Sequence, residues 1–281
     1  MFGAAPAALP PDAPACLEAP GASAWDDVWI VIPAYNEART IRALAEAASA
    51  CCARVIVIDD GSTDGTLASL RGVPVTTVRH GVNQGKAASL RTAFAYALAH
   101  GAAAAITLDG DGQHDPADAG RLLAAWRTAP ESIVIGSRLH DRSRFPPARY
   151  VGNRVACFWI SWAAGHRVAD SQSGFRVYPR AVMQIAVGTR VRSSRFTMES
   201  EILIEAARRG HTTVAVTIPG RYPEGARRSH YRAARDTMRI VAMVALRLLG
   251  RAMYPQGLWR SLRPAPPRRA DPTLGDRSGA R

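Results

Sequence analysis

Short, uninterrupted runs of apolar residues, rich in Val and Ile, recur along the chain up to residue 219. They span residues 28–33, 54–59, 75–80, 104–109, 132–137 and 213–219. Because apolar residues in these runs do not alternate with polar ones, the pattern is typical of strands that are covered on both faces. We therefore predict a strand at each run.

Alanine-rich stretches with helical character separate the first five runs. They cover residues 37–51, 64–71, 84–99 and 116–127. Strands and helices that alternate at this spacing predict an α/β fold, in which a mostly parallel sheet is flanked by helices on both faces. Ligands of such sheets bind beyond the carboxyl ends of the strands, so functional residues are expected there.

The two ends of the chain differ in composition from its middle. Residues 1–24 contain several prolines and no basic segment, so they are predicted to be a disordered leader rather than a signal peptide. We assign residues 25–225 to one α/β domain, 226–260 to a basic amphipathic helical region and 261–281 to a disordered basic tail. The longest apolar run near the C-terminus, 240–246, is far shorter than the roughly 20 residues that cross a bilayer. No transmembrane helix is expected.

Positive charge is concentrated in the C-terminal part of the chain. Residues 221–281 contain 14 arginines and four acidic residues, which is +10 of the total net charge of +13. A stripe with helical spacing is formed by Arg228, Arg232, Arg235 and Arg239. The stripe suits a helix that lies on anionic lipid, although a helix packed on the domain with solvated arginines explains it almost as well. We expect a cytoplasmic protein that is either soluble or peripheral at the inner face of the cell membrane, and find no motif for sequence-specific binding of nucleic acid.

Polar signatures follow two of the first predicted strands. The first is "IPAYNEA", in which Asn36 is expected to cap a helix. The second is "VIDDGSTDGT", in which Asp59 and Asp60 close the strand and Asp64 can cap the next helix. Two adjacent carboxylates exceed what capping requires. One of them could accept a hydrogen bond from a base N–H or a ribose hydroxyl.

A third signature, "ITLDGDGQHDP", begins at Ile106. Side chains alternate along a strand, so Asp109 and Asp111 are expected to point the same way, with Gly110 leaving the backbone open to a ligand. Two carboxylates that face each other repel unless a cation or a proton neutralises them, and hard oxygen ligands favour Mg²⁺ or Mn²⁺. Asp115 is expected to cap a helix that starts at Pro116.

Taken together, these signatures resemble those of the family 2 glycosyltransferases, in particular the group of dolichol-phosphate mannose synthases and polyprenyl-phosphate glycosyltransferases. The matching segments occur in the order of that group: "IPAYNE", "DDGSTDGT", "NQGKAASLRTAF", "LDGDGQHDP", "GSR" and "DSQSGFRVYP". The resemblance covers roughly residues 28–230. It implies the Rossmann-like GT-A fold and transfer of a sugar, with inversion, from a UDP- or GDP-sugar to a lipid phosphate or polyprenyl phosphate.

The resemblance also implies roles for particular residues. It makes Asp109 and Asp111, with Gln113 beside them, the ligands of Mg²⁺ or Mn²⁺. The residues expected to contact the nucleotide-sugar are Pro33, Tyr35, Glu37, Ile58, Asp60, Lys86, Asp109, Gly110, Gln113, Arg228 and His230. For Lys86, a solvated position at the start of a helix is an equally good interpretation, and "GVNQGKAAS" does not have the spacing of a Walker phosphate loop.

Three further residues are expected to take part in catalysis. Arg138 would face the phosphates or the acceptor, and Asp170 would lie near the sugar. The segment "FTMESEILIEAARRG" is predicted to form an amphipathic helix, and of its two acidic residues Glu199 and Glu201 we select Glu201. A lipid-phosphate acceptor is already anionic and needs no general base, whereas a hydroxyl acceptor would need a carboxylate.

Two other functions compete with this interpretation. A nucleotidyltransferase also combines a nucleotide-binding α/β sheet with carboxylate-bound Mg²⁺, but its glycine-rich basic loop is replaced here by "IPAYNE". A non-enzymatic module that binds anionic lipid would explain the basic C-terminal part. The intact set of Asp109, Asp111 and Gln113 argues against such a decayed site.

Overall fold

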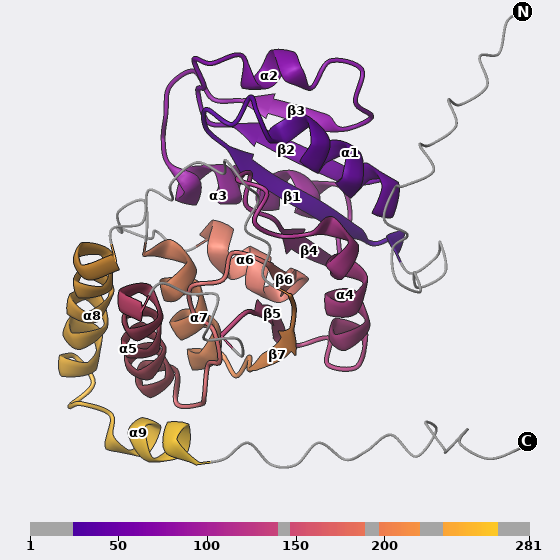
Figure 1. Ribbon diagram of the computed structural model, residues 1–281. Helices are drawn as coiled ribbons and strands as arrows, with labels where there is room; N and C mark the ends of the chain where they lie inside the picture. Colours follow the sequence, from indigo (N-terminus) through magenta and orange to yellow (C-terminus); the bar gives the residue numbers. More distant parts are fainter. Residues whose placement is uncertain (1–24, 140–146, 189–196, 220–232, 264–281) are drawn as a thin grey trace, which may run out of the picture.

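The computed structural model describes residues 25–139, 147–188, 197–219 and 233–263. A seven-stranded sheet with the order β3-β2-β1-β4-β6-β5-β7 forms its centre (Figure 1). The strands are β1 (Val28–Ala34), β2 (Val55–Asp59), β3 (Thr76–Arg79), β4 (Ala104–Thr107), β5 (Ile133–Ser137), β6 (Arg176–Pro179) and β7 (Thr213–Thr217). All neighbouring strands pair in parallel except β6, which is antiparallel to both β4 and β5. The predicted α/β fold with a mostly parallel sheet is confirmed.

Helices cover both faces of the sheet, as the alternating pattern predicts (Figure 1). The helices are α1 (Ile41–Cys51), α2 (Thr66–Ser69), α3 (Lys86–Ala99), α4 (Ala119–Arg127, after a short 3₁₀ turn at Pro116–Asp118), α5 (Pro147–Ala164), α6 (Arg180–Gly188), α7 (Met198–Arg208), α8 (Ala233–Leu249) and α9 (Pro255–Leu262). Side chains of β1 alternate between two separate cores. Val31 belongs to the core that contains residues of α3 and α5 to α8, whereas Ile30 belongs to the core that contains residues of α1 and α4. This alternation places an apolar layer on each side of the sheet.

Two aspects of the predicted sheet are wrong. Strand β6 was not expected, because its four residues, "RVYP", form no apolar run, and a strand that ends in proline carries a weak signal. The strands β3 and β7 are not covered on both faces; all their positions are half-buried or exposed. Both lie at the edges of the sheet, where fewer neighbours cover them.

The helices of the C-terminal half were only partly anticipated. Helix α5, of 18 residues, and helix α6 were not expected. The helical period of the apolar residues is weak in α5, whereas α6 buries Val182, Met183, Ile185 and Ala186 on one face, a signal that was missed. Helix α8 lies in the region predicted to be helical, and both α8 and α9 pack against α5. Within the described residues, no helix combines the length and the apolar character needed to cross a membrane. Disorder is predicted for residues 1–24 and 261–281. Residues 1–24 and 264–281 lie outside the described residues, whereas Ser261 and Leu262 belong to α9, so the predicted tail begins too early.

The turn after β2 gives a test of the fold. Gly61 has φ +74°, and a Cβ at this position would lie 2.7 Å from the carbonyl carbon of Val82. Gly65 has φ +88°, but a Cβ at that position would meet no atom within 4 Å. An alanine at position 65 therefore adds backbone strain without a steric clash. We expect Gly65→Ala to lower the free energy of unfolding by about 1–2 kcal/mol and Gly61→Ala by a further 1–3 kcal/mol or so, because of the added clash. Urea unfolding of both variants measures the difference; equal losses would contradict the close approach.

Candidate functional site

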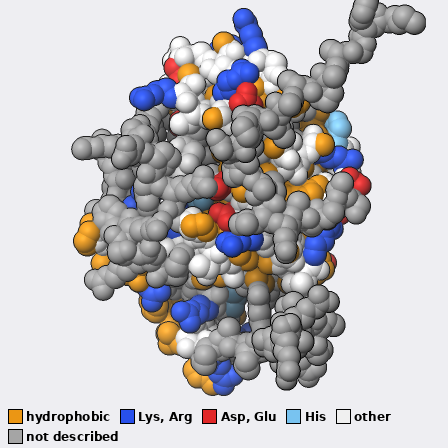
Figure 2. All heavy atoms as spheres, turned by 45° about the vertical axis from the view of Figure 1, so that its right-hand side comes forward, with side chains coloured by type: hydrophobic (Ala, Val, Ile, Leu, Met, Phe, Trp, Pro, Cys, Tyr) orange, Lys and Arg blue, Asp and Glu red, His pale blue; other side chains and the backbone are white. Residues whose placement is uncertain are grey.

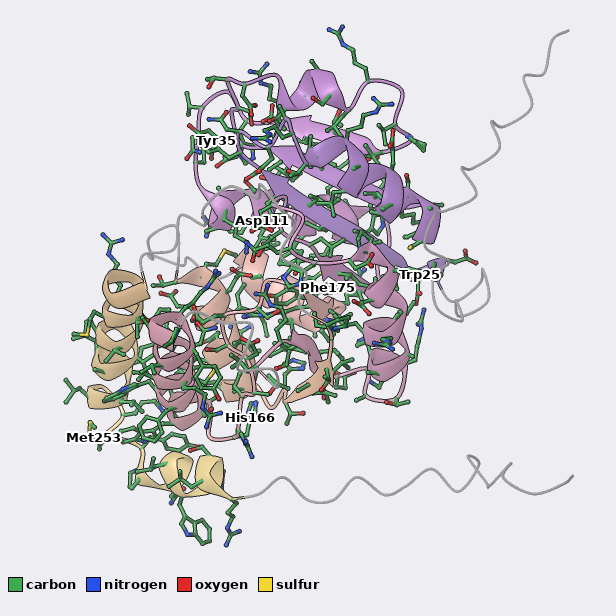
Figure 3. All side chains as sticks on the ribbon, in the orientation of Figure 1. Trp25, Tyr35, Asp111, His166, Phe175 and Met253 are labelled. Atoms are coloured by element: carbon green, nitrogen blue, oxygen red, sulfur yellow. The ribbon has the colours of Figure 1, made fainter. Side chains whose placement is uncertain are left out.

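The carboxyl ends of β1, β2 and β4 meet at one edge of the sheet. In the parallel register Ala34 is opposite Asp59, and the Asp60 N–H donates to the Ala34 carbonyl at 2.8 Å. The loops that follow these strands contain the three polar signatures. Figure 3 labels Tyr35 and Asp111 on this side of the sheet. The fold therefore brings the predicted strand-end residues together.

The first two loops are joined by hydrogen bonds. The Asn36 N–H donates to Ser62 Oγ at 2.9 Å, and Asn36 Oδ1 accepts from the Thr63 N–H at 2.8 Å. The Glu37 N–H donates to Thr66 Oγ1 at 2.9 Å. The prediction that Asn36 caps a helix is wrong: Asn36 has φ 57°, and helix α1 begins only at Ile41. Its side chain fixes the second loop instead.

Asp60 is the anchor of the loop that leads into α3. Its carboxylate accepts hydrogen bonds from the N–H groups of Gln84 at 2.9 Å and Gly85 at 2.7 Å. It also contacts His80 Nδ1 at 2.8 Å, and the side chain is almost fully buried. Three partners on one carboxylate hold this loop in place. Asp60 thereby determines where Lys86, the next residue but one after Gln84, enters the site.

The third loop has a different conformation from the one expected. Strand β4 ends at Thr107, so Asp109 and Asp111 lie in a turn and strand alternation does not govern their direction. They are only two residues apart in the loop; burial raises the pKa of Asp111, and the charge of Asp109 raises it further. The loop is fixed to α1 because Thr40 Oγ1 donates to the Gly110 carbonyl at 2.7 Å. The expected cap at Asp115 is confirmed, since its carboxylate accepts from the Ala117 N–H at 3.0 Å.

Lys86 connects the third loop to helix α7. Its Nζ lies 2.6 Å from Asp109 Oδ1 and 2.9 Å from Glu199 Oε2. Burial opposes the charge of Lys86, but these two carboxylates outweigh it and raise the pKa of Lys86. Burial likewise opposes ionisation of Asp109, yet the Lys86 ammonium dominates and lowers the pKa of Asp109 to about 2. Lys86 is therefore a charged partner of two carboxylates and not a solvated lysine.

Arg138 and Asp170 form a second group beside the third loop. Arg138 Nη1 donates to Gln113 Oε1 at 3.3 Å, and the Arg138 N–H donates to Asp170 Oδ2 at 3.2 Å. Both side chains are buried, and the Arg138 Nε has no hydrogen-bond partner. Burial raises the pKa of Asp170, although the Arg138 charge counteracts it. Among the described residues, Gln113 Oε1 accepts only this one hydrogen bond, and its second lone pair stays available for a metal ion.

The two acidic residues of α7 occupy different environments. Glu199, the alternative to the selected Glu201, contacts Lys86 and retains one buried oxygen, Oε1, without a hydrogen-bond partner. Glu201 is buried, and its Oε2 lies 3.3 Å from Nη2 of Arg247 in α8. The structure thus brings Glu199, rather than Glu201, to Asp109. No feature of "TMESEI" distinguishes the two in advance.

The remaining predicted residues are more peripheral to this group. Pro33 pairs with Ile58 in the sheet, and the Ile58 side chain is fully buried in the core. Tyr35 lies in the first loop and is 38% exposed. Arg228 and His230 lie outside the described residues.

A metal ion fits the donor set at the third loop. Asp109 and Asp111 offer carboxylate oxygens that are partly accessible, and such ligands suit Mg²⁺ or Mn²⁺. In the described part of the chain, no three residues among His, Cys, Asp and Glu cluster as a metal site. An ion held by only two carboxylates would complete its shell with substrate oxygens.

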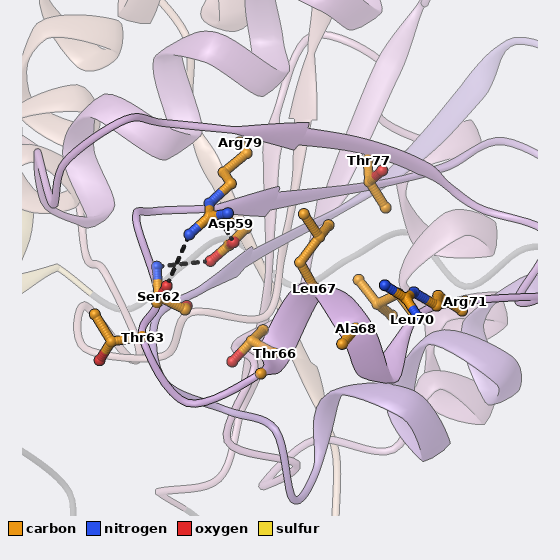
Figure 4. A pocket seen from close by; sticks show the side chains of 11 residues that line it. Asp59, Ser62, Thr63, Thr66, Leu67, Ala68, Leu70, Arg71, Thr77 and Arg79 are labelled. Atoms are coloured by element: carbon orange, nitrogen blue, oxygen red, sulfur yellow. Dashed lines mark hydrogen bonds and ion pairs between the residues drawn. The ribbon is translucent and has the colours of Figure 1, made fainter.

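A separate hollow of about 530 Å³ lies between α2 and β3 (Figure 4). Asp59, Ser62, Thr66 and Arg79 are among the residues that line it, and Arg79 contacts both Asp59 and the Ser62 carbonyl. It contains neither Asp109 nor Lys86. We therefore base the site on the carboxylate group and not on this hollow.

Comparison with known proteins gives a consistent result. The family profile described as "Glycosyl transferase family 2" matches residues 29–184. The chain is 30% identical over 208 residues to an undecaprenyl-phosphate mannosyltransferase of Micrococcus luteus, covering 68% of this chain and 82% of that protein. It is 28% identical to a UDP-N-acetylglucosamine–dolichyl-phosphate N-acetylglucosaminyltransferase of Methanococcus voltae, over 64% of this chain and 79% of that one.

Solved structures support the GT-A fold. Glucosyl-3-phosphoglycerate synthase of Mycobacterium tuberculosis, in complex with Mn²⁺, UDP and phosphoglyceric acid, superposes with a TM-score of 0.60. The two chains are 19% identical, and the superposition covers 80% of each. At this level of identity the likeness concerns the fold.

Gly174 gives a first test of the site. A Cβ on Gly174 would lie 2.7 Å from the carboxyl carbon of Asp109, so Gly174→Ala should push that side chain away from Lys86. Because only the end of a side chain has to move, we expect a stability loss below about 1.5 kcal/mol but weaker binding of Mn²⁺ with a nucleoside diphosphate, by roughly tenfold or more. Calorimetry measures the binding. Gly188→Ala, with no atom near its Cβ, is the control; unchanged binding in Gly174→Ala would contradict the placement of Asp109.

Lys86 gives a second test. In Lys86→Met the carboxylates of Asp109 and Glu199 lose their cation, so we expect the free energy of unfolding to fall by about 1–3 kcal/mol. Mn²⁺ should then raise the melting temperature of this variant more than that of the wild type, because the ion replaces the missing charge. Thermal unfolding with and without Mn²⁺ measures both effects. Lys86→Arg, which keeps the charge, should lose less stability than Lys86→Met; equal losses would show that charge is not what matters.

Proposed function

The chain belongs to glycosyl transferase family 2, and from this premise we propose that it transfers a sugar, with inversion, from a nucleotide-sugar to a polyprenyl phosphate. The donor would be a UDP- or GDP-sugar, and Mg²⁺ or Mn²⁺ would assist. The observation that carries the proposal is the pair of neighbouring carboxylates, Asp109 and Asp111, at the carboxyl end of β4.

The chemistry of the leaving group explains why such a pair is useful. Cleavage of a nucleotide-sugar releases a nucleoside diphosphate, on which negative charge increases as the bond breaks. A divalent ion held by Asp109 and Asp111 would neutralise that charge as a Lewis acid. The chain itself contributes cationic groups: Lys86 beside Asp109, and Arg138, whose buried Nε has no hydrogen-bond partner. Both can donate charge-assisted hydrogen bonds to phosphate.

The nature of the acceptor determines whether a base is needed. A lipid phosphate presents an anionic oxygen that can attack without losing a proton. A hydroxyl acceptor would need a base, for which Asp170 is the best-placed candidate because burial raises its pKa. The relatives from Micrococcus luteus and Methanococcus voltae are named for undecaprenyl-phosphate and dolichyl-phosphate acceptors, which supports the lipid phosphate.

The predicted roles of other residues follow this scheme. Tyr35 and Glu37, in the loop after β1, would contact the nucleotide, together with Pro33. Asp60 would act through the loop that it anchors, because its carboxylate already has three partners. Glu201 would act on the site through α7, since its carboxylate contacts Arg247.

A donor and acceptor screen tests the proposal. Purified protein is incubated with radiolabelled UDP- or GDP-sugars, Mn²⁺ and undecaprenyl phosphate, and label is measured in the organic phase with NDP in the aqueous phase. Transfer with release of NDP is expected. Release of pyrophosphate would support a nucleotidyltransferase, and absence of metal-dependent nucleotide binding would support a non-enzymatic module.

Replacement of Asp111 tests the metal assignment. Asp111→Asn keeps the size of the side chain and removes its charge, so turnover should fall by about 100-fold or more. The matched control is Glu46→Gln, which removes an exposed carboxylate paired with Arg42 on α1. This control should retain activity and stability. Full activity of Asp111→Asn would refute the metal role of this residue.

A further inference from the structure

Helix α8 has apolar residues on two opposite sides. Ile240, Val244 and Leu248 are buried against the domain. Leu246 and Leu249 lie on the outer side and are 71% and 64% exposed. A surface helix of a protein that meets only water normally has a polar outer side. The outer side of α8 is therefore unusual.

The neighbouring helices expose apolar residues as well. Helix α5, which packs against α8, exposes Val151, Val155 and Phe158, spaced by four and three residues and so on one side of the helix. Helix α9, which also packs against α5, exposes Trp259 and Leu262. We define the C-terminal apolar face as Val151, Val155, Phe158, Met238, Leu246, Leu249, Trp259 and Leu262. Each of these is more than a third exposed.

The described side chains of α5, α8 and α9 carry charges of one sign. Residues 147–164 and 237–263 contain seven arginines and no Asp or Glu. One of the arginines, Arg263, lies with its guanidinium carbon 3.3 Å from the centre of the Trp259 ring. At the lower left of Figure 2, hydrophobic side chains adjoin Lys or Arg side chains, with no acidic side chain visible among those described. Apolar and aromatic groups bordered by arginine are the composition of surfaces that enter the headgroup region of a bilayer.

We propose that the C-terminal apolar face docks on an anionic lipid bilayer. Apolar side chains from α5, α8 and α9 enter the boundary between headgroups and acyl chains, and the arginines contact lipid phosphates. A second copy of the chain fits less well, because a two-fold interface would place arginine-rich surfaces opposite each other without acidic partners. This surface differs from the arginine stripe expected from the sequence, of which Arg228 and Arg232 lie outside the described residues.

Vesicle sedimentation of the full chain tests the proposal. The vesicles consist of phosphatidylcholine alone, or of phosphatidylcholine with about 30 mol% of the anionic lipid phosphatidylglycerol, and contain no polyprenyl phosphate. We expect binding to the anionic vesicles that weakens as salt increases, and little binding to the neutral ones. Because neither donor nor acceptor is present, the result does not depend on the proposed function.

The variant Leu246→Gln/Leu249→Gln removes two apolar contacts of the face. We expect its partition coefficient on anionic vesicles to fall at least about tenfold, with an unchanged circular dichroism spectrum. Val187→Gln, which changes an exposed apolar residue of α6 outside the face, is the matched control and should bind as the wild type does. Turnover with a short, water-soluble polyprenyl phosphate should be the same in all three proteins.

Three outcomes would overturn the proposal. The first is that the wild type does not bind anionic vesicles. The second is that the double variant binds as tightly as the wild type, which would assign binding to other basic segments. The third is that the wild type is a dimer that the double variant loses, which would make the face an interface between two copies.

Discussion

The contact of Lys86 with Asp109 and Glu199 is the interaction on which the site depends. It joins the start of α3, the loop after β4 and the first turn of α7, which are far apart in the sequence. Two carboxylates at this distance from one ammonium would repel each other without it, so the cation sets the position of Asp109 before any ligand arrives. Lys86 is also the only lysine of the chain; every other residue in the Lys and Arg total of 36 is arginine.

The identity of this residue has a physical meaning. An ammonium is a compact charge on a flexible stem, whereas a guanidinium is a broad, planar fork. A compact charge can lie between two carboxylates in the way that a small metal ion would, and its stem lets it move toward a phosphate when one binds. In a chain that otherwise uses arginine throughout, a lysine at this point is consistent with a role that a planar fork would fill poorly.

The parts of the fold that the sequence predicted are those with local signals. The strands β1, β2, β4 and β5 are continuous apolar runs because they are buried between two helical layers, and burial on both faces leaves no room for polar residues. Strand β6 has no such signal. It begins with Arg176, whose buried guanidinium donates to the carbonyls of Ser171 and Glu199 at 2.7 and 3.3 Å. Those partners are set by the tertiary fold, so a local pattern could not reveal the strand.

The same distinction applies to the site, and helix α7 shows why. The topology of a parallel sheet brings the strand-end loops together, so their adjacency could be predicted. Residues two apart on a helix point in different directions, so Glu199 and Glu201 cannot share one environment, and only the packing of α7 decides which faces Asp109. Here Lys86 holds Glu199 from one side and Arg247 of α8 holds Glu201 from the other. Helix α8, whose outer side is apolar and exposed, thus contacts Glu201. Glu201 lies in the same turn of α7 as Glu199, the carboxylate that contacts Lys86. A displacement of α8 larger than the flexible Arg247 side chain can follow must therefore either break the Arg247–Glu201 contact or move Glu199 with α7, which links the position of the outer helix to the geometry of the site.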